Sequence, residues 1–462
     1  MLYDTIAAIS TAMAPAGIGI VRVSGEDSIP LVSGIFRPKG KKPLSAAGSH
    51  TLQYGHVVDP MSGRIIDEVL VSVMKGPNSF TAENVVEINS HGGILVLRKV
   101  LELVLGQGAR LAEPGEFTKR AFLNGRIELS QAEAIMDVIN AKTERALQLS
   151  VRQLEGRLGE KTARFKDILL SLIAHIEASI DYPEYDIEEL AVETVMDRLE
   201  ALKGDMQALV ETFDQGRMLK EGINTAIVGK PNVGKSSLLN ALLQEQRAIV
   251  TEIPGTTRDT LEEVVNIQGI PLRLVDTAGI RDTEDHVERI GIERSLGALQ
   301  KADLVLFMVD GSRPLEEGDR AIVERIKDKK VIVLLNKMDL EVKASQKELR
   351  ELLTDHPVVP VSAKNREGIG LLEHHIKEMF FHGEIENTEE QEVLLSNVRH
   401  KNAVVQAVGS LDHVMEAIRA GMPEDCWSID LKNAYERIGE ITGESIKEDL
   451  MGQIFSQFCL GK

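Results

Sequence analysis

Residues 229–236 constrain this chain of 462 residues more than any other feature. They read Gly-Lys-Pro-Asn-Val-Gly-Lys-Ser, which matches the pattern G-x-x-x-x-G-K-S between a strand-like run at 224–228 and a helix-like run at 237–243. Glycines in such a loop let backbone N–H groups and a helix N-terminus surround phosphates. By itself the pattern also fits an ordinary glycine turn, but its context predicts a phosphate-binding loop.

Within this loop, Lys235 is expected to meet the β and γ oxygens of a nucleotide and to act in catalysis. The hydroxyl of Ser236 is expected to bind Mg²⁺. The complete phosphate site that we expect consists of Asn232, Val233, Gly234, Lys235, Ser236 and Ser237.

Residues 276–279 and 336–339 follow in the order and spacing of a GTP-binding domain. Asp276 ends a strand-like run and is expected to hold Mg²⁺ through water, while the Gly279 amide meets the γ-phosphate. Asp339 follows the strand-like run 331–335 and can accept the N1–H and 2-amino donors of guanine, a pair that adenine lacks. A site built around such a buried acceptor rejects the wrong base. Residues 362–364 are expected to support the base from behind, so the chain should bind GTP and not ATP.

The nucleotide-binding residues expected from these later segments share short loops at strand ends. They are Asp276, Thr277, Ala278, Gly279, Asn336, Lys337, Asp339, Ser362, Ala363 and Lys364.

Residues 255–259 lie where switch I is expected, and Thr257 is the candidate second hydroxyl ligand of Mg²⁺. Ile280 stands where Ras-like enzymes place a water-orienting Gln, so hydrolysis needs another device. A K⁺ ion is one candidate, because a positive charge offsets the negative charge that develops between the β- and γ-phosphates. The side-chain oxygen of Asn232 could bind K⁺, with the shell completed by carbonyls of the switch I stretch, at Thr251, Ile253 and Thr256.

Glu288 is the candidate group for positioning the attacking water, since it lies in the charged segment 281–289. Taken alone, a carboxylate in such a segment is more often a solvated charge on a helix surface.

Composition excludes several classes of protein. Hydrophobic residues make up 43% and charged residues 27%, as in ordinary globular proteins. The longest apolar runs, 304–309 and 331–335, are much shorter than the roughly 20 residues of a membrane span and indicate buried strands. Cys426 and Cys459 are too few for a disulfide framework, so we expect a cytoplasmic protein. The net charge of −19 disfavours autonomous binding of nucleic acid, so an RNA substrate would need a local basic patch or a basic partner.

Pattern changes along the chain predict an α/β plus all-α organisation. Residues 1–117 alternate short β-branched runs with Gly and Pro, as in a compact α/β domain. Helical periodicity follows at 118–218 and resumes at 384–462. Strand and helix signals alternate in 219–383, which predicts a mostly parallel sheet with helices on both faces, inserted into the helical domain. The acidic segment 181–186 is expected to be a turn between two helices.

Several segments are more specific than these motifs. They are Gly-Ile-Val-Arg-Val-Ser-Gly at 19–25, Gly-Pro-Asn-Ser-Phe-Thr at 76–81, His-Gly-Gly at 91–93, the run 114–125 and Phe-Cys-Leu-Gly-Lys at 458–462. With them, the whole chain resembles the MnmE/TrmE family of tRNA-modification GTPases. The resemblance implies an N-terminal domain that binds tetrahydrofolate and dimerises, a helical domain, and an inserted Ras-like G domain whose K⁺-dependent dimerisation stimulates hydrolysis. It supports the roles given to Asn232 and Glu288.

The resemblance also implies a reaction and a partner. Members work with a FAD-dependent partner, MnmG/GidA, in a heterotetrameric complex. Together they add a carboxymethylaminomethyl or aminomethyl group to C5 of the wobble uridine of certain tRNAs, with a one-carbon unit from methylene- or formyltetrahydrofolate. A partner that carries much of the RNA contact would reconcile an RNA substrate with the net charge of −19.

Folate roles transfer from the family to Arg22, Glu87, Arg126 and Lys462. A pterin offers donors to a carboxylate such as Glu87, and its glutamate tail attracts cations. Arg126 stands where the family pattern has Lys, and Leu460 where it has Ile. Cys459 is a candidate nucleophile or one-carbon carrier, with a small buried apolar residue beside Phe455 and Phe458 as the alternative.

Two hypotheses from other classes remain open at this point. A ribosome-assembly GTPase would share the nucleotide motifs and act as a binding switch. A helical scaffold could use its G domain only to control dimer geometry. Folate binding to the N-terminal residues would separate both from a tRNA-modifying enzyme.

Overall fold

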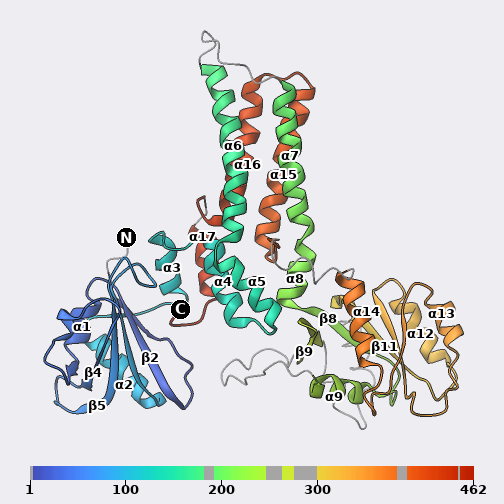
Figure 1. Cartoon of the computed structure of the whole chain (residues 1–462), viewed down its shortest axis with the longest axis horizontal. Coiled ribbons are helices and arrows are strands. Elements are labelled where there is room, and N and C mark those ends of the chain that lie inside the picture. Colours follow the sequence, from blue (N-terminus) through green and yellow to red (C-terminus); the bar gives the residue numbers. More distant parts are fainter. Residues whose placement is uncertain (1–3, 182–191, 246–262, 275–298, 382–392, 446–447) are drawn as a thin grey trace. The chain divides into compact units, whose positions relative to one another are not determined.

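The computed structural model describes residues 4–181, 192–245, 263–274, 299–381, 393–445 and 448–462 (Figure 1). These form two compact units. The first unit comprises Met1–Met136, Gln153–Lys166 and Ile438–Lys462, and the second comprises Asp137–Arg152 and Asp167–Arg437. The division of the chain into the four ranges expected from the sequence stays a prediction.

The first unit is built on a sheet of seven strands in the order β3-β4-β5-β6-β2-β1-β7. Its neighbouring strands are antiparallel except β1 and β7, which are parallel. The strands are β1 (Ile6–Ile9), β2 (Ala16–Ser24), β3 (Phe36–Pro38), β4 (Thr51–Val58), β5 (Ile65–Met74), β6 (Val85–Gly92) and β7 (Arg110–Leu111). The helices that accompany them are α1 (Ser28–Ser33), α2 (Ile94–Gly106) and α3 (Glu116–Leu123).

Alternation along the strands divides this sheet into two faces. Val21, Val23 and Ile88 point toward α2 and pack with Leu97 and Val100 in the core. The residues between them in β2 and β6 therefore lie on the opposite face, where α3 contributes a second small cluster around Phe117. This geometry decides which polar side chains can meet on that face.

The second unit contains a sheet of six strands in the order β13-β12-β11-β8-β10-β9. Only β9 and β10 pair antiparallel, so the sheet is mostly parallel, as expected. The strands are β8 (Ile223–Val228), β9 (Glu263–Ile267), β10 (Ile270–Leu274), β11 (Leu304–Asp310), β12 (Val331–Asn336) and β13 (Val358–Pro360). The helices are α9 (Lys235–Glu245), α12 (Glu317–Ile326), α13 (Gln346–Leu352) and α14 (Ile369–Phe381).

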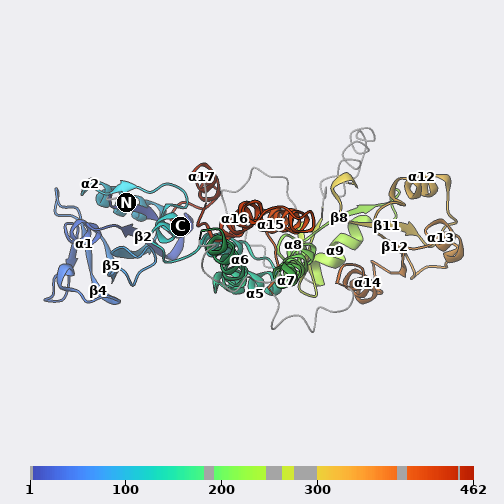
Figure 2. The ribbon, with the colours of Figure 1, turned by 90° about the horizontal axis from the view of Figure 1, so that it is seen from above.

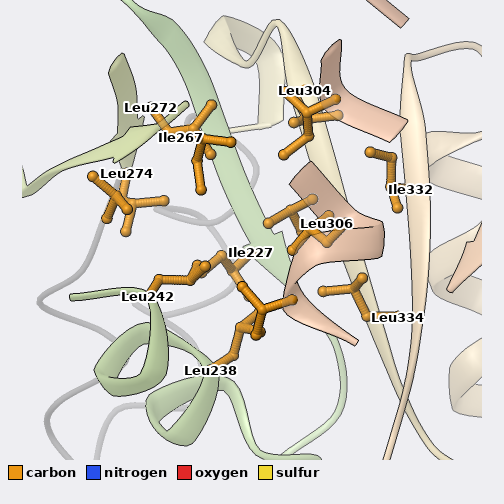
Figure 3. Packing of buried hydrophobic residues seen from close by; sticks show 14 of the residues in the cluster. Ile227, Leu238, Leu242, Ile267, Leu272, Leu274, Leu304, Leu306, Ile332 and Leu334 are labelled. Carbon is orange, nitrogen blue, oxygen red and sulfur yellow. The ribbon is translucent and has the colours of Figure 1, made fainter. Parts of the chain in front are cut away.

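Helices cover both faces of this sheet (Figure 2). Leu306 and Leu334 pack on one face with Leu238 and Leu242 of α9, as Figure 3 shows. The residues that alternate with them, such as Phe307 and Leu335, point to the opposite face, toward α12 and α13. The uninterrupted apolar runs of β11 and β12 are thus explained, because both of their faces are buried.

The remaining described elements are helical. They are α4 (Leu129–Asn140), α5 (Glu144–Leu154), α6 (Arg157–Asp181), α7 (Val192–Glu211), α8 (Phe213–Glu221), α15 (Val398–Arg419), α16 (Glu424–Thr442) and α17 (Glu448–Ser456). In the second unit α7 lies beside α15, and Lys203 forms an ion pair with Asp412 at 2.5 Å. Helical periodicity therefore predicted these segments correctly, whereas most of the acidic segment 181–186 lies outside the described residues.

None of the helices within the described ranges combines the length and the apolar character that are needed to cross a bilayer.

Candidate functional site

The phosphate loop (residues 229–236) runs from the end of β8 to the start of α9, as predicted. Lys235 turns back over the loop, and its Nζ donates to the carbonyl oxygens of Gly229 at 2.7 Å and Lys230 at 2.9 Å. Burial lowers the pKa of Lys235, and nearby phosphates would offset that effect by favouring the charged form. This arrangement suits an anion held beside the loop.

Glycine is required at one position of the phosphate loop by both backbone and space. Gly234 has a φ of 104°, and a Cβ there would collide with the side-chain amide of Asn336. Asn232 also adopts a left-handed conformation, with a φ of 62°, which asparagine tolerates better than most residues. The loop therefore approaches the base loop (residues 336–339) very closely.

Asn336 is the link between the loops. Its side-chain amide donates to the carbonyl oxygen of Val233 at 2.7 Å, and its side-chain oxygen accepts from the Ala363 amide at 3.0 Å. Asn336 is 3% exposed, so both bonds are buried. Three segments that are far apart in the sequence are thus held together by one side chain.

Asp339 is oriented by the hydroxyl of Ser362, which donates to its Oδ1 at 2.7 Å. This hydrogen bond and the charges of Lys364 and Lys337 keep the pKa of Asp339 below its ordinary value. The expectation of a buried acceptor was wrong, because Asp339 is an exposed residue in the loop after β12. Its carboxylate is therefore ionised and accessible to a ligand.

Several predicted nucleotide-site residues lie outside the described residues. They are Thr251, Ile253, Thr256, Thr257, Asp276, Thr277, Ala278, Gly279 and Glu288. Within the described ranges, no group of His, Cys, Asp and Glu side chains forms a metal cluster.

The first unit brings together the residues for which a folate role was expected. Arg22 and Glu87 are directly opposite each other on β2 and β6, and Arg22 Nε donates to Glu87 Oε1 at 2.9 Å. The guanidinium of Arg22 lies over the rings of Phe80 and Phe117, with Cζ 5.3 and 5.6 Å from their centroids. Arg126 lies over the same Phe80 ring at 5.2 Å. Two arginines therefore lie over the Phe80 ring, and one of them also pairs with a carboxylate.

Lys462 belongs to the same cluster. Burial and the positive charge of Arg22 lower its pKa, while Glu87 acts in the opposite direction. The preceding residue, Gly461, offers its carbonyl oxygen to Ser10 Oγ at 3.0 Å and to Arg22 Nη1 at 3.4 Å. A Cβ at Gly461 would collide with the carbonyl oxygen of Ile9, so only glycine fits against β1 here.

Cys459 corrects one of the two interpretations offered for it. The residue is exposed, whereas its neighbours Phe455 and Phe458 are 2% and 6% exposed. It is therefore not a small buried apolar residue: Phe455 in α17 and Phe458 in the turn after it are buried, whereas the Cys459 side chain is exposed.

Sequence reasoning missed four contributors to this cluster, which are Ser10, Phe80, Phe117 and Gly461. Phe80, Phe117 and Gly461 stand inside the specific segments at 76–81, 114–125 and 458–462, which was the only signal available. Ser72, in register with Glu87 on β5, adds a buried hydroxyl that has no hydrogen-bond partner among the described residues.

Comparisons with known proteins agree along the whole chain. The family model described as "GTP-binding protein TrmE N-terminus" matches residues 5–126, and that of the "MnmE helical domain" matches residues 129–459. The tRNA modification GTPase MnmE of Alkaliphilus oremlandii (strain OhILAs) is 50% identical over 459 residues, which is 99% of each chain. That of Thermoanaerobacter pseudethanolicus is 51% identical over 462 residues, the full length of both chains.

Among solved structures, the G domain of the T. maritima FeoB iron transporter is 29% identical and covers 33% of this chain and 96% of that chain. Its TM-score is 0.25, so the fold assignment here depends on the observed strand order instead. Full-length identity of about half and family matches to both the N-terminal and helical parts have one explanation. This chain belongs to the MnmE family of tRNA modification GTPases and is a GTP hydrolase with an α/β N-terminal domain, a helical domain and a Ras-like G domain.

Proposed function

We propose that this chain couples GTP hydrolysis to the addition of a carboxymethylaminomethyl or aminomethyl group to C5 of the wobble uridine of certain tRNAs. It would act with a FAD-dependent partner of the MnmG/GidA type in a heterotetrameric complex. The observation that carries this proposal is the cation-rich cluster at Arg22, which suits a folate that donates the one-carbon unit. Family membership favours this proposal over the ribosome-assembly switch and the helical scaffold.

The folate proposal follows from charge and shape. The three cations Arg22, Arg126 and Lys462 accompany a single carboxylate, Glu87, and burial together with the positive charge of Arg22 lowers the pKa of Lys462. A glutamate tail would neutralise that excess, and Glu87 keeps a second oxygen for the donors of a pterin ring. A bound tetrahydrofolate derivative would supply the one-carbon unit. The exposed Cys459 is proposed as a further reactive group at the edge of this cluster.

GTP, GDP and Mg²⁺ are the ligands that a GTPase takes, and we propose the phosphate loop and the base loop as their site. Lys235 would hold the β- and γ-phosphates, and Ser236 and Thr257 would offer hydroxyls to Mg²⁺. Ser237, Val233 and Gly234 would complete the loop around the phosphates. From segment 276–279, Asp276 would hold Mg²⁺ through water and the Gly279 amide would meet the γ-phosphate. Asp339, backed by Ser362, Ala363 and Lys364, would accept the guanine donors.

We further propose that K⁺ binds beside the phosphates at Asn232, with carbonyls of Thr251, Ile253 and Thr256, when two G domains dimerise. Glu288 would position the attacking water. The left-handed backbone at this position by itself favours an asparagine, whether or not a cation binds there. The test of this proposal is therefore to compare GTP turnover in different cations.

We propose that residues 1–117 form the folate-binding and dimerisation domain. The helical domain would consist of residues 118–218 and 384–462, with the G domain, residues 219–383, between its two parts. We place the homodimer and its tRNA substrate in the cytoplasm, which agrees with the unpaired Cys426 and Cys459.

The test is mass spectrometry of wobble-uridine nucleosides in tRNA from cells that lack this chain, with and without a rescuing copy. Loss and restoration of the C5 modification are expected. Rescue by the Arg22→Ala variant should fail, whereas Arg98→Ala, which removes an exposed arginine of α2 from the opposite face of the sheet, should rescue fully. An unchanged nucleoside profile in the deletion strain would refute the tRNA assignment.

A further inference from the structure

Asp310, which none of the predicted motifs contains, ends strand β11 beside the base loop. Its Oδ2 accepts a hydrogen bond from Lys337 Nζ at 2.6 Å. Its Oδ1 accepts from the amide of Ser312 at 3.0 Å and from the Ser312 hydroxyl at 2.6 Å. The side chain of Asp310 is 12% exposed, so the carboxylate is held on both oxygens in a mostly buried position.

This carboxylate is ionised. Burial by itself would raise the pKa of Asp310, but the hydrogen bonds from Lys337 and Ser312 outweigh it and lower the pKa below its ordinary value. The backbone adds a second connection, because the Gly311 amide donates to the carbonyl oxygen of Asn336 at 2.8 Å. The turn after β11 thus supports the base loop through both side chain and main chain.

The two charged side chains of the base loop diverge. Strand β12 lies between β11 and β13. Lys337, which has a left-handed φ of 65°, reaches toward Asp310 on the β11 side. Asp339 reaches toward Ser362, which follows β13 on the other side. The charge of Lys337 nonetheless acts on Asp339, since it contributes to lowering the pKa of that carboxylate.

We propose that Asp310 is a positioning residue for guanine recognition, because its ion pair holds the Lys337 ammonium away from Asp339. Without the Asp310 carboxylate, Lys337 could pair with Asp339, which lies two positions further along the same loop. A charged donor on Asp339 competes with the neutral N1–H and 2-amino donors of guanine, since a hydrogen bond between opposite charges is stronger than one in which only the acceptor is charged. This inference rests on the proposed function of Asp339 as the guanine acceptor.

The experiment compares GDP with IDP, whose base lacks the 2-amino group, by displacement of a fluorescent GDP analogue from the full chain. Asp310→Asn keeps an oxygen for Ser312 but removes the charge that attracts Lys337. We expect it to weaken GDP binding about tenfold, the loss of roughly one charge-assisted hydrogen bond, and to narrow the preference for GDP over IDP. A purely structural effect of the substitution would weaken the binding of GDP and of IDP in the same proportion.

A double variant identifies the route of the effect. In a chain that carries Lys337→Met, the ammonium that Asp310 binds is gone, so adding Asp310→Asn should cause no further loss of the preference for GDP over IDP. Asp303→Asn is the matched control, because Asp303 precedes β11 at its other end and binds the Asn224 amide at 3.0 Å and Arg217 at 3.2 Å. This control should keep the GDP preference even if it lowers the melting temperature.

The outcomes separate the two proposals. A wild-type chain that prefers GDP, together with an Asp310→Asn variant that keeps the full preference, would overturn the role of Asp310 alone. A wild-type chain that binds GDP and IDP equally would overturn the proposed guanine site at Asp339 as well.

Discussion

The side-chain amide of Asn336 donates a hydrogen bond to the carbonyl oxygen of Val233 at 2.7 Å, so a buried residue of the base loop is fixed to the phosphate loop. The same side chain accepts from the Ala363 amide at 3.0 Å. In the proposed nucleotide site, binding of the base and binding of the phosphates would therefore both depend on this contact. Removal of this hydrogen bond should weaken the binding of both the base and the phosphates of the nucleotide.

Asn336→Ala is expected to destabilise the G domain by about 2 to 4 kcal/mol, because it leaves one buried acceptor and one buried donor without partners. Nucleotide affinity should fall with it. Urea unfolding and titration with a fluorescent GDP analogue measure the two effects. The matched control is Asn365→Ala, an exposed asparagine two positions after Ala363, which should change stability by less than about 0.5 kcal/mol. Equal effects of the two substitutions would contradict the role given to Asn336.

Arg120→Met is expected to destabilise the first sheet strongly. Arg120 is 1% exposed and pairs with Asp4 at 2.7 Å and with Glu116 at 3.1 Å. Removing one partner of a buried pair costs about 3 to 5 kcal/mol, because it leaves buried charge uncompensated.

Arg110→Ala provides the comparison, since Arg110 pairs with the same two carboxylates but is 42% exposed. It should cost about 1 kcal/mol or less. Hydrogen exchange of the amides in β1 and β2 measures both losses within the full chain. If the exposed arginine proved to be the costlier one, burial would not be the source of the effect.

Folate binding is expected to weaken as pH rises, because Lys462 has a lowered pKa and loses its proton earlier than an ordinary lysine. A bound anion favours the protonated form, so binding above that pKa should take up a proton. The stability of the ligand-free chain should depend on pH in the opposite direction. The unfolded chain holds the Lys462 proton more tightly, so the free energy of unfolding should rise with pH between the lowered pKa of Lys462 and the ordinary pKa of lysine.

Calorimetry of formyltetrahydrofolate binding at pH about 9, in buffers with different ionisation enthalpies, measures the proton uptake. Lys462→Arg keeps the charge without titrating in this range and should bind folate with no uptake. Proton uptake that persisted in this variant would have to come from another group.

GTP turnover is expected to be roughly tenfold faster or more in K⁺ than in Na⁺, equivalent to about 1.4 kcal/mol of the barrier. Asn232→Gly is the sharpest variant, because glycine keeps the left-handed backbone while removing the side-chain oxygen. It should bind GTP normally and lose the K⁺ stimulation. Equal turnover of the wild-type chain in the two salts would refute the cation role of Asn232.

Local patterns made much of the G domain predictable. The strand at 331–335 and the loop at 336–339 could be placed because apolar runs, glycines and short motifs act over a few residues. The exposure of Asp339 could not be predicted, because the exposure of a loop side chain depends on neighbouring loops that are distant in the sequence.

The cluster proposed for folate shows this limit of local patterns more clearly. The family resemblance indicated Arg22 and Glu87, but their direct pairing depends on the register between β2 and β6. Register is a property of the folded sheet, and a slip of β2 by one residue would turn Arg22 to the α2 face and away from Glu87. The burial of Arg120 and the pairing of Asp310 with Lys337 likewise depend on contacts between elements, for which no local pattern exists.

The contact between Ser10 and Gly461 joins residues 451 positions apart, and it lies within the cluster proposed for folate. During synthesis on a ribosome, β1 and β2 emerge early and can form their core against α2 long before residue 461 leaves the exit tunnel. The contacts of Gly461 and Lys462 can form only after the residues between Ser10 and Gly461 have been synthesised. A truncated or stalled product would therefore carry an N-terminal sheet that lacks the Ser10–Gly461 hydrogen bond and the charge of Lys462, so the cluster proposed for folate would be incomplete.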